Sequence, residues 1–354
     1  MKKERVLWLD ALKGVAIIFV VLGHILLGYT ENNAFVAYNA DMKVLQQWIY
    51  VWHMPLFFMI SGITFYMGCF NHSGILNKNK MKRNCTNLLF LYGIFDIVII
   101  VLKVLFSNFV DNRINGMEIL FNIFFPDTLM WYLWVLIIYY IIFSRVICLK
   151  NNKKVEIVLL GLALLIKMID VRYGLRLCIK NVFYCAPFFY IGIILEKKWS
   201  ISRSKNFIRD MYGTIIMIVL GTEVVLFSAC YVSKEYVKIP VDLRVIIELI
   251  TAICICLLLI NAFKRSAFYK KARFLSELGK ASLVIYLVHT YIVTALKRIT
   301  ISIGMADPFG ACLFILIITL ITTYGIYWMS QRNKVLRYLF RPITLFENIS
   351  FYKK

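Results

Sequence analysis

Residues 15–29 of this chain read Val-Ala-Ile-Ile-Phe-Val-Val-Leu-Gly-His-Ile-Leu-Leu-Gly-Tyr, a run that is apolar at nearly every position. An α-helix rises 1.5 Å per residue, so about 20 residues of this kind cross a bilayer core of roughly 30 Å. Lys13 and His24 are the basic side chains within the wider block 12–29. The stretch therefore predicts a transmembrane helix that carries a histidine.

Nine further apolar blocks follow along the chain. Their approximate bounds are 48–68, 88–106, 130–149, 155–170, 182–195, 212–232, 244–262, 282–299 and 309–329. Because the long runs lack the period-2 alternation of a membrane β-barrel, we expect helices. The whole chain, residues 1–354, is then one all-α domain, a polytopic membrane bundle of about ten transmembrane helices.

Composition and charge agree with a membrane protein. The chain is 61% hydrophobic and 17% charged, whereas soluble domains average about 45–50% and about 25%. The net charge of +22 would suggest nucleic-acid binding in a soluble protein. Here the Lys and Arg residues favour alternate loops by roughly three to one, as the positive-inside rule requires. We therefore expect both termini in the cytoplasm, a bacterial plasma membrane and no nucleic-acid partner.

Cysteine and the N-terminus add little. The nine cysteines form no C-x-x-C pair, so no zinc site is expected and no metal is predicted. The basic start followed by an apolar run resembles a signal peptide, but Asp10 and Lys13 interrupt the run and no small-residue cleavage pattern follows. We interpret the first block as a permanent span.

Two histidines are predicted at similar depth. Lys13 and His24 are 11 residues apart, so at 3.6 residues per turn they share one face of the first helix, with Asp10 close enough to pair with Lys13. The second helix runs back and carries His53, followed by Pro55, which removes a backbone donor. Two imidazoles beside a loosened backbone indicate a site.

Several motifs together resemble the acyltransferase-3 family of multi-pass enzymes that O-acylate surface polysaccharides, peptidoglycan and other sugars. The motifs are L-D-A-L-K-G through G-H (9–24), H-M-P-L-F-F-M-I-S-G (53–62), W-Y-L (131–133) and S-L-V-I-Y-L-V-H (282–289). The Lys-Gly and His-Met-Pro versions look most like the fucose 4-O-acetylase-like branch. This resemblance implies that His24 is the essential histidine.

The chain also departs from that family's pattern. Lys13 stands where arginine is usual, so a point charge remains but bidentate phosphate contacts are lost. The family often has two arginines three apart after the second helix, where this chain has Asn84 and Asn87. The basic residues just upstream are expected to supply that charge to the phosphates of acetyl-CoA, the expected acyl donor: Lys80, Lys82 and Arg83.

Other polar residues in or near the apolar blocks are candidates for the lining of the site. Ionisable groups in transmembrane helices usually face the bundle interior or a wet cavity. The candidates are Asp10, Ser61, Glu223, Glu248 and His289. Each also has a structural interpretation, such as an interhelical hydrogen bond, and the same alternative stays open for His53.

Acyl transfer to a sugar hydroxyl needs a base for the hydroxyl proton and donors for the developing oxyanion. We expect an O-acyltransferase in which His24 is a general base or a transient acyl carrier and His53 assists. The acceptor would be a surface polysaccharide or its sugar precursor, with a protein of the polysaccharide-assembly machinery as a further candidate partner. The alternative is a transporter or flippase of a lipid-linked sugar, with a His/Glu proton relay.

Overall fold

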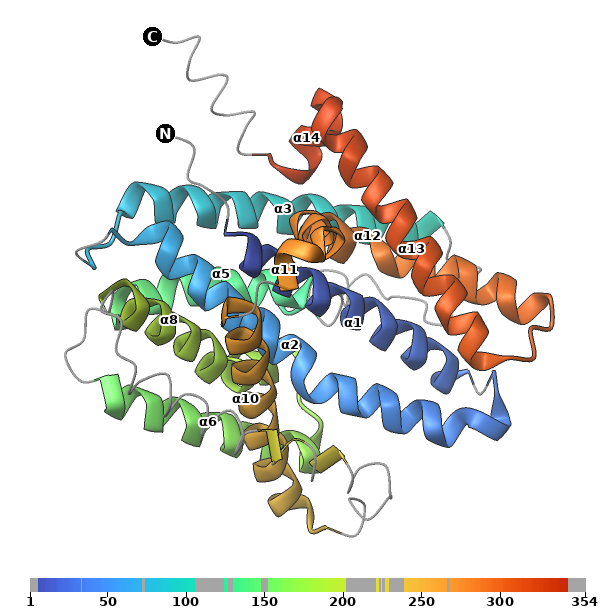
Figure 1. The fold of residues 1–354 in the computed structure, drawn as a ribbon, viewed down its shortest axis with the longest axis horizontal. Helices are drawn as coiled ribbons and strands as arrows, with labels where there is room; N and C mark the ends of the chain where they lie inside the picture. The colour runs from blue at the N-terminus through green and yellow to red at the C-terminus, as the bar shows by residue number, and fades with distance from the viewer. Residues whose placement is uncertain are drawn as a thin grey trace. The chain divides into compact units, whose positions relative to one another are not determined.

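The computed structural model describes residues 6–32, 34–71, 74–105, 124–126, 130–147, 152–201, 239–265 and 268–342, with a few single residues between 221 and 228. Over these residues the chain is helical apart from its connecting loops and one isolated antiparallel bridge between Phe70 and Leu76. Figure 1 shows the helices in chain order. The prediction of an all-α fold is confirmed.

Seven segments of the described chain are long and apolar enough to cross a membrane. They are Leu7–Glu31, Val36–Cys69, Lys78–Val101, Leu177–Trp199, Val241–Arg265, Arg273–Ser302 and Pro308–Arg332. Helix α5 (Trp131–Val146) is apolar but shorter. The polytopic helix bundle is thus confirmed.

Three of the predicted apolar blocks do not appear as single membrane-spanning helices in the described residues. Block 155–170 forms a helix, α6 (Asn152–Tyr173), which does not qualify as a span because charged residues interrupt its apolar run. Block 182–195 is divided at Cys185 into α7 (Leu177–Tyr184) and α8 (Ala186–Ile201). Most of block 212–232 lies outside the described residues.

The chain forms two compact units. The first contains residues Met1–Ile60 and Ser202–Trp328, and the second contains Ser61–Ile201 and Met329–Lys354. Within the described residues, the helices of the first unit are α1 (Leu7–Glu31), the first part of α2 (Asn39–Cys69), α10 (Val241–Arg265), α11 (Phe268–Lys271), α12 (Arg273–Ser302) and most of α13 (Pro308–Arg332).

Helix α1 is the core of the first unit. It packs along α12 and also contacts α10 and α11 (Figure 1). Its side chains are buried on more than one face; Leu12, Ile17, Val21 and Ile25 are at most 1% exposed. No residue of α1 from Trp8 to Thr30 is fully exposed, so this apolar helix lies inside its unit.

Helices α1 and α12 run parallel and cross closely at their N-terminal ends. A Cβ at Gly14 would overlap the carbonyl oxygen of Leu275, and a Cβ at Gly279 would overlap the carbonyl oxygen of Asp10. Glycine is needed here because only a missing Cβ allows two helix backbones to approach this closely. The parallel direction is the one expected for the first and ninth of ten consecutive spans.

The C-terminal ends of the same two helices are joined by hydrogen bonds. The Tyr29 and Thr300 hydroxyls lie 2.6 Å apart and are buried. The Lys297 ammonium donates to the carbonyl oxygen of Gly28 over 3.2 Å. Helix α1 is therefore fixed against α12 at both ends.

The second unit packs around aromatic side chains. Its described helices are the end of α2, α3 (Lys78–Leu105), α5, α6, α7, α8, the end of α13 and α14 (Lys334–Phe340). The ring of Phe189 on α8 contacts Phe65, Tyr139 and Phe143 at centroid distances of 5.1–5.6 Å. The backbone of α8 approaches Gly62 so closely that a Cβ there would overlap the Phe189 carbonyl oxygen.

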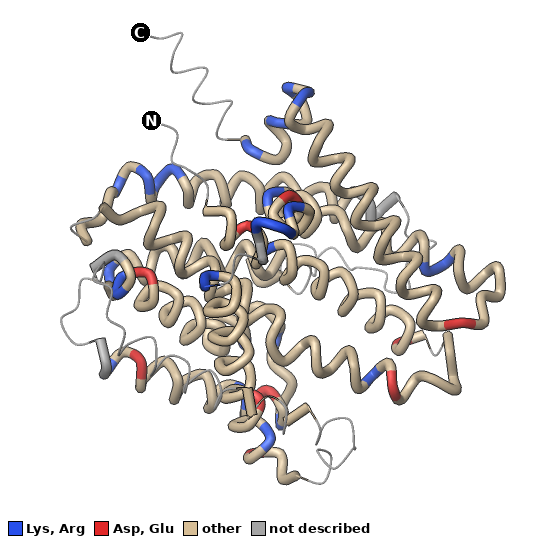
Figure 2. Tube along the Cα trace, viewed as in Figure 1, with Lys and Arg blue, Asp and Glu red and all other residues tan. Residues whose placement is uncertain are grey.

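Charged residues are absent from long stretches of the described helices. Along α2 after Lys43, and along α13 before Arg332, the trace carries no Lys, Arg, Asp or Glu (Figure 2). Such stretches can contact lipid without desolvating a charge.

Candidate functional site

Three imidazoles from three helices converge inside the first unit. The rings of His24 on α1 and His289 on α12 have centroids 5.1 Å apart. The Tyr50 ring on α2 is close to both His24 and His53, at centroid distances of 6.4 Å and 4.8 Å. The chain has four histidines, so three of them share this one location.

The burial of the three rings differs. His53 is 3% exposed and His289 is 0% exposed, whereas His24 is partly exposed. A polar ring that is buried among apolar helices needs hydrogen-bond partners, because an unsatisfied buried group costs about 1–3 kcal/mol. His24 is therefore the least enclosed of the three rings.

The backbone of α2 holds the His53 ring through a hydrogen bond to Nδ1. Nδ1 of His53 lies 2.8 Å from the carbonyl oxygen of Ile49. A carbonyl oxygen can only accept, so this geometry assigns the proton to Nδ1 and leaves a lone pair on Nε2. Pro55 lies within α2, as the sequence requires, and its ring removes one backbone donor next to this histidine.

Tyr50 is a site residue that the sequence analysis missed. It precedes His53 by three positions and so shares its face of α2. Its ring packs against α1 at Gly23, where a Cβ would lie 3.3 Å from a ring carbon of Tyr50. The signal was present in the sequence, as a glycine directly before His24 and a tyrosine one turn before His53.

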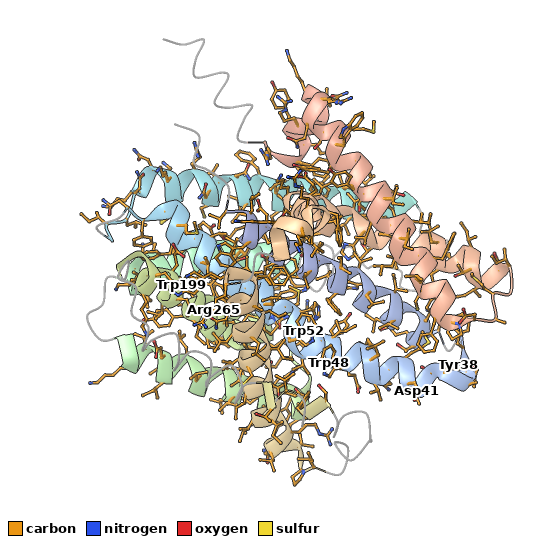
Figure 3. The ribbon with its side chains drawn as sticks, viewed as in Figure 1. Tyr38, Asp41, Trp48, Trp52, Trp199 and Arg265 are labelled. Atoms are coloured by element: carbon orange, nitrogen blue, oxygen red, sulfur yellow. The ribbon has the colours of Figure 1, made fainter. Side chains whose placement is uncertain are left out.

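Aromatic packing next to the histidines fixes α2 against its neighbours in the first unit. Figure 3 labels Trp48 and Trp52, one turn apart on α2. Trp52 contacts Phe19 of α1 edge-to-face at 4.8 Å and Trp48 at 5.6 Å. The Trp48 indole donates to the hydroxyl of Ser228 over 3.1 Å. Ring contacts of this kind limit the rotation of α2 and so hold His53 in place.

A charged pair lies at the N-terminal end of α1. The Lys13 ammonium is 3.8 Å from Oδ1 of Asp10, and the two side chains are 25% and 13% exposed. At 1.5 Å per residue, Lys13 lies about 16 Å below His24 along the axis. The arrangement offers one cation near the helix end and a base further in.

The chain was then compared with known proteins. The family profile described as "Acyltransferase domain" in the acyltransferase-3 family matches residues 6–330. The chain belongs to the acyltransferase-3 family. The match covers all three converging histidines and most of both units. Searches of the curated proteins and of the solved structures each return no match.

Membership in the acyltransferase-3 family makes the chain a membrane acyltransferase. Its histidine cluster combines motifs that are far apart in the sequence: residues 9–24, 53–62 and 282–289 contribute one imidazole each. In the described part of the chain, no three His, Cys, Asp or Glu side chains are arranged to hold a metal ion.

The second unit of this acyltransferase joins two other motifs. The Ser61 hydroxyl on α2 and the Tyr132 hydroxyl on α5 lie 2.8 Å apart. The first belongs to the motif 53–62 and the second to the W-Y-L motif 131–133. Ser61 is partly buried, so its predicted role in lining the site stays a prediction next to this structural hydrogen bond.

The other predicted residues are more scattered. Glu248 is partly buried on α10, a helix that contacts α1, and Glu223 lies outside the described residues. Three predicted donor ligands are exposed at the start of α3 in the second unit: Lys80, Lys82 and Arg83. Asn84, which replaces one of the expected arginines, donates toward the Cys69 sulfur at the end of α2 over 3.7 Å.

Proposed function

We propose that this acyltransferase-3 protein transfers an acetyl group from cytoplasmic acetyl-CoA to a hydroxyl of a surface polysaccharide or of its sugar precursor. The observation that carries the proposal is the convergence of His24, His53 and His289 in a chain of this family. The fucose 4-O-acetylase-like motifs in residues 9–24 and 53–62 support a sugar acceptor. Among the described residues, no structural observation favours a transporter or flippase.

The chemistry assigned to His24 is proton transfer. The acceptor hydroxyl oxygen attacks the thioester carbonyl carbon, His24 takes the hydroxyl proton, and the proton passes to the sulfur of CoA as the C–S bond breaks. A variant of this route places the acetyl group on His24 for one step before the sugar receives it. In both routes His53 assists by lining the site on α2.

The side of the membrane follows from charge. The excess of Lys and Arg in alternate loops supports a cytoplasmic position for both termini, and with them for the Lys13 end of α1. Acetyl-CoA is anionic and cytoplasmic, so its phosphates would meet Lys13 at the helix end, with Lys80, Lys82 and Arg83 as further cations on that side. The thioester arm would then extend toward His24 in a bacterial plasma membrane.

Deleting the gene should remove O-acetyl groups from the surface glycans of the producing cell. Proton NMR of the purified glycans checks this, because O-acetyl methyl protons give a separate signal. Re-expression of the wild-type chain is the control and should restore the signal. Acetylation that is retained at the wild-type level in the deletion strain would contradict the proposed acceptor.

Replacing Lys13 by glutamine should raise the KM for acetyl-CoA by about 10–100-fold, the effect of losing one hydrogen bond to a charged group. The kcat should change little, because Lys13 lies far from the acetyl carbon in this proposal. The exposed Lys43 on α2 of the same unit gives a matched control: Lys43→Gln removes the same charge and should leave KM unchanged. Equal KM values for Lys13→Gln and the wild type would disprove the donor contact.

A further inference from the structure

We propose that His289 is a positioning residue: it accepts a hydrogen bond from His24 and so aims the second nitrogen of His24 at the acceptor hydroxyl. This inference rests on the proposed function, since it concerns the proton transfer that is assigned to His24.

Hydrogen bonds to the backbone of α12 determine which nitrogen of neutral His289 carries the proton. Its Nδ1 lies 2.9 Å from the carbonyl oxygens of both Ile285 and Tyr286, one turn back on its own helix. Both partners can only accept, so Nδ1 carries the proton and Nε2 carries a lone pair. The backbone of α12 thereby fixes the tautomer and the orientation of the ring.

The other ring nitrogen of His289, Nε2, points away from the backbone of α12. Because Nδ1 is directed at the backbone of α12, Nε2 lies on the far side of the ring, away from that backbone. Nε2 is buried and has no hydrogen-bond partner among the described residues, and the whole residue is 0% exposed. A buried acceptor without a donor is uncommon in a native fold and is expected to have a function.

His24 is the candidate hydrogen-bond donor to Nε2 of His289. The His24 ring is the imidazole beside His289, with centroids 5.1 Å apart and planes inclined by 55°. At this separation, a His24 nitrogen that faces Nε2 of His289 can come within the usual 2.7–3.2 Å of a hydrogen bond.

A hydrogen bond from His24 to Nε2 of His289 has a chemical consequence. It places the N–H of neutral His24 toward α12 and leaves the lone pair on the other nitrogen, which can then take the hydroxyl proton. The bond strengthens once His24 becomes an imidazolium, because a charged donor makes the stronger hydrogen bond. His289 stays neutral throughout, and the proton leaves on the sulfur of CoA.

Two substitutions separate the two nitrogens of His289. The amide N–H of His289→Asn keeps the donor to the carbonyl oxygens on α12 and removes the acceptor. His289→Gln places an amide oxygen near the former Nε2 and keeps the acceptor. With detergent-purified protein, labelled acetyl-CoA and glycans from the deletion strain, His289→Asn should lower kcat about 100-fold with little change in the KM for acetyl-CoA, whereas His289→Gln should stay within about tenfold of wild type.

The control is Val293→Ala, which removes a buried side chain one turn further along α12 and should leave kcat near the wild-type value. If His289→Gln does not accumulate, added imidazole should restore activity to His289→Ala, and an absence of rescue would overturn the proposal. Equal kcat losses in the asparagine and glutamine variants, or none in either, would also overturn it. A wild-type protein that transfers no acetyl group would instead remove the proposed function itself.

Discussion

Alanine in place of His24 should abolish acyl transfer while the protein still accumulates in the membrane. General base catalysis is worth about 10²–10⁴ in rate, and the variant loses the imidazole to which the proton transfer is assigned. The same loss is expected for the route with an acetyl-imidazole. Transfer of labelled acetyl groups to glycans, at matched protein abundance, measures the effect.

Thr30→Ala is the matched control on the same helix. The Thr30 hydroxyl donates to the Leu27 carbonyl oxygen one turn back on its own helix, so its removal should leave transfer and abundance close to wild type. Full acetylation by His24→Ala would show that the catalytic assignment is wrong, although the family membership would stand.

Valine in place of Gly279 should prevent the first unit from folding. The added Cβ would overlap the Asp10 carbonyl oxygen, and the Gly14 nitrogen lies 3.0 Å from the same point. Overpacking against flexible side chains costs about 1–3 kcal/mol, and here the obstacle is backbone on both helices, which has no rotamer to change. Membrane abundance and the thermal midpoint of the detergent-extracted protein report the loss.

Gly325→Val provides the comparison, since Gly325 is also a helical glycine of the first unit and nothing lies within 4 Å of its Cβ position. This variant should accumulate like the wild type. Normal abundance and thermal midpoint for Gly279→Val would refute the close crossing of α1 and α12.

The sequence predicts the elements of this fold better than their arrangement. The apolar run 12–29 leads directly to α1 (Leu7–Glu31), because its length and composition leave a helix as the only way to satisfy the backbone in lipid. The charges of α6 and the break at Cys185 were harder to interpret. The sequences of the connecting segments do not determine whether a short apolar block forms a complete transmembrane span by itself.

The sequence names His24, His53 and His289 as candidates, but it gives the mutual position of only the first two. His24 and His53 follow from two neighbouring antiparallel helices, so their similar depth could be derived from the sequence. His289 lies far along the chain, and its approach to His24 depends on the two glycines at which α1 and α12 cross. Tyr50 was overlooked because a tyrosine near the end of an apolar block is more often an interfacial anchor.

Helix α1 is held against α12 by glycine contacts at one end and by the Tyr29–Thr300 hydroxyl pair at the other. These contacts limit how the sequence of the enzyme can change during evolution. The pair of helices that carries His24 and His289 tolerates little drift, because a shift at either end would move the imidazoles relative to one another. New acceptor preferences are therefore expected to evolve through substitutions on other helices, while this pair is inherited as a fixed part.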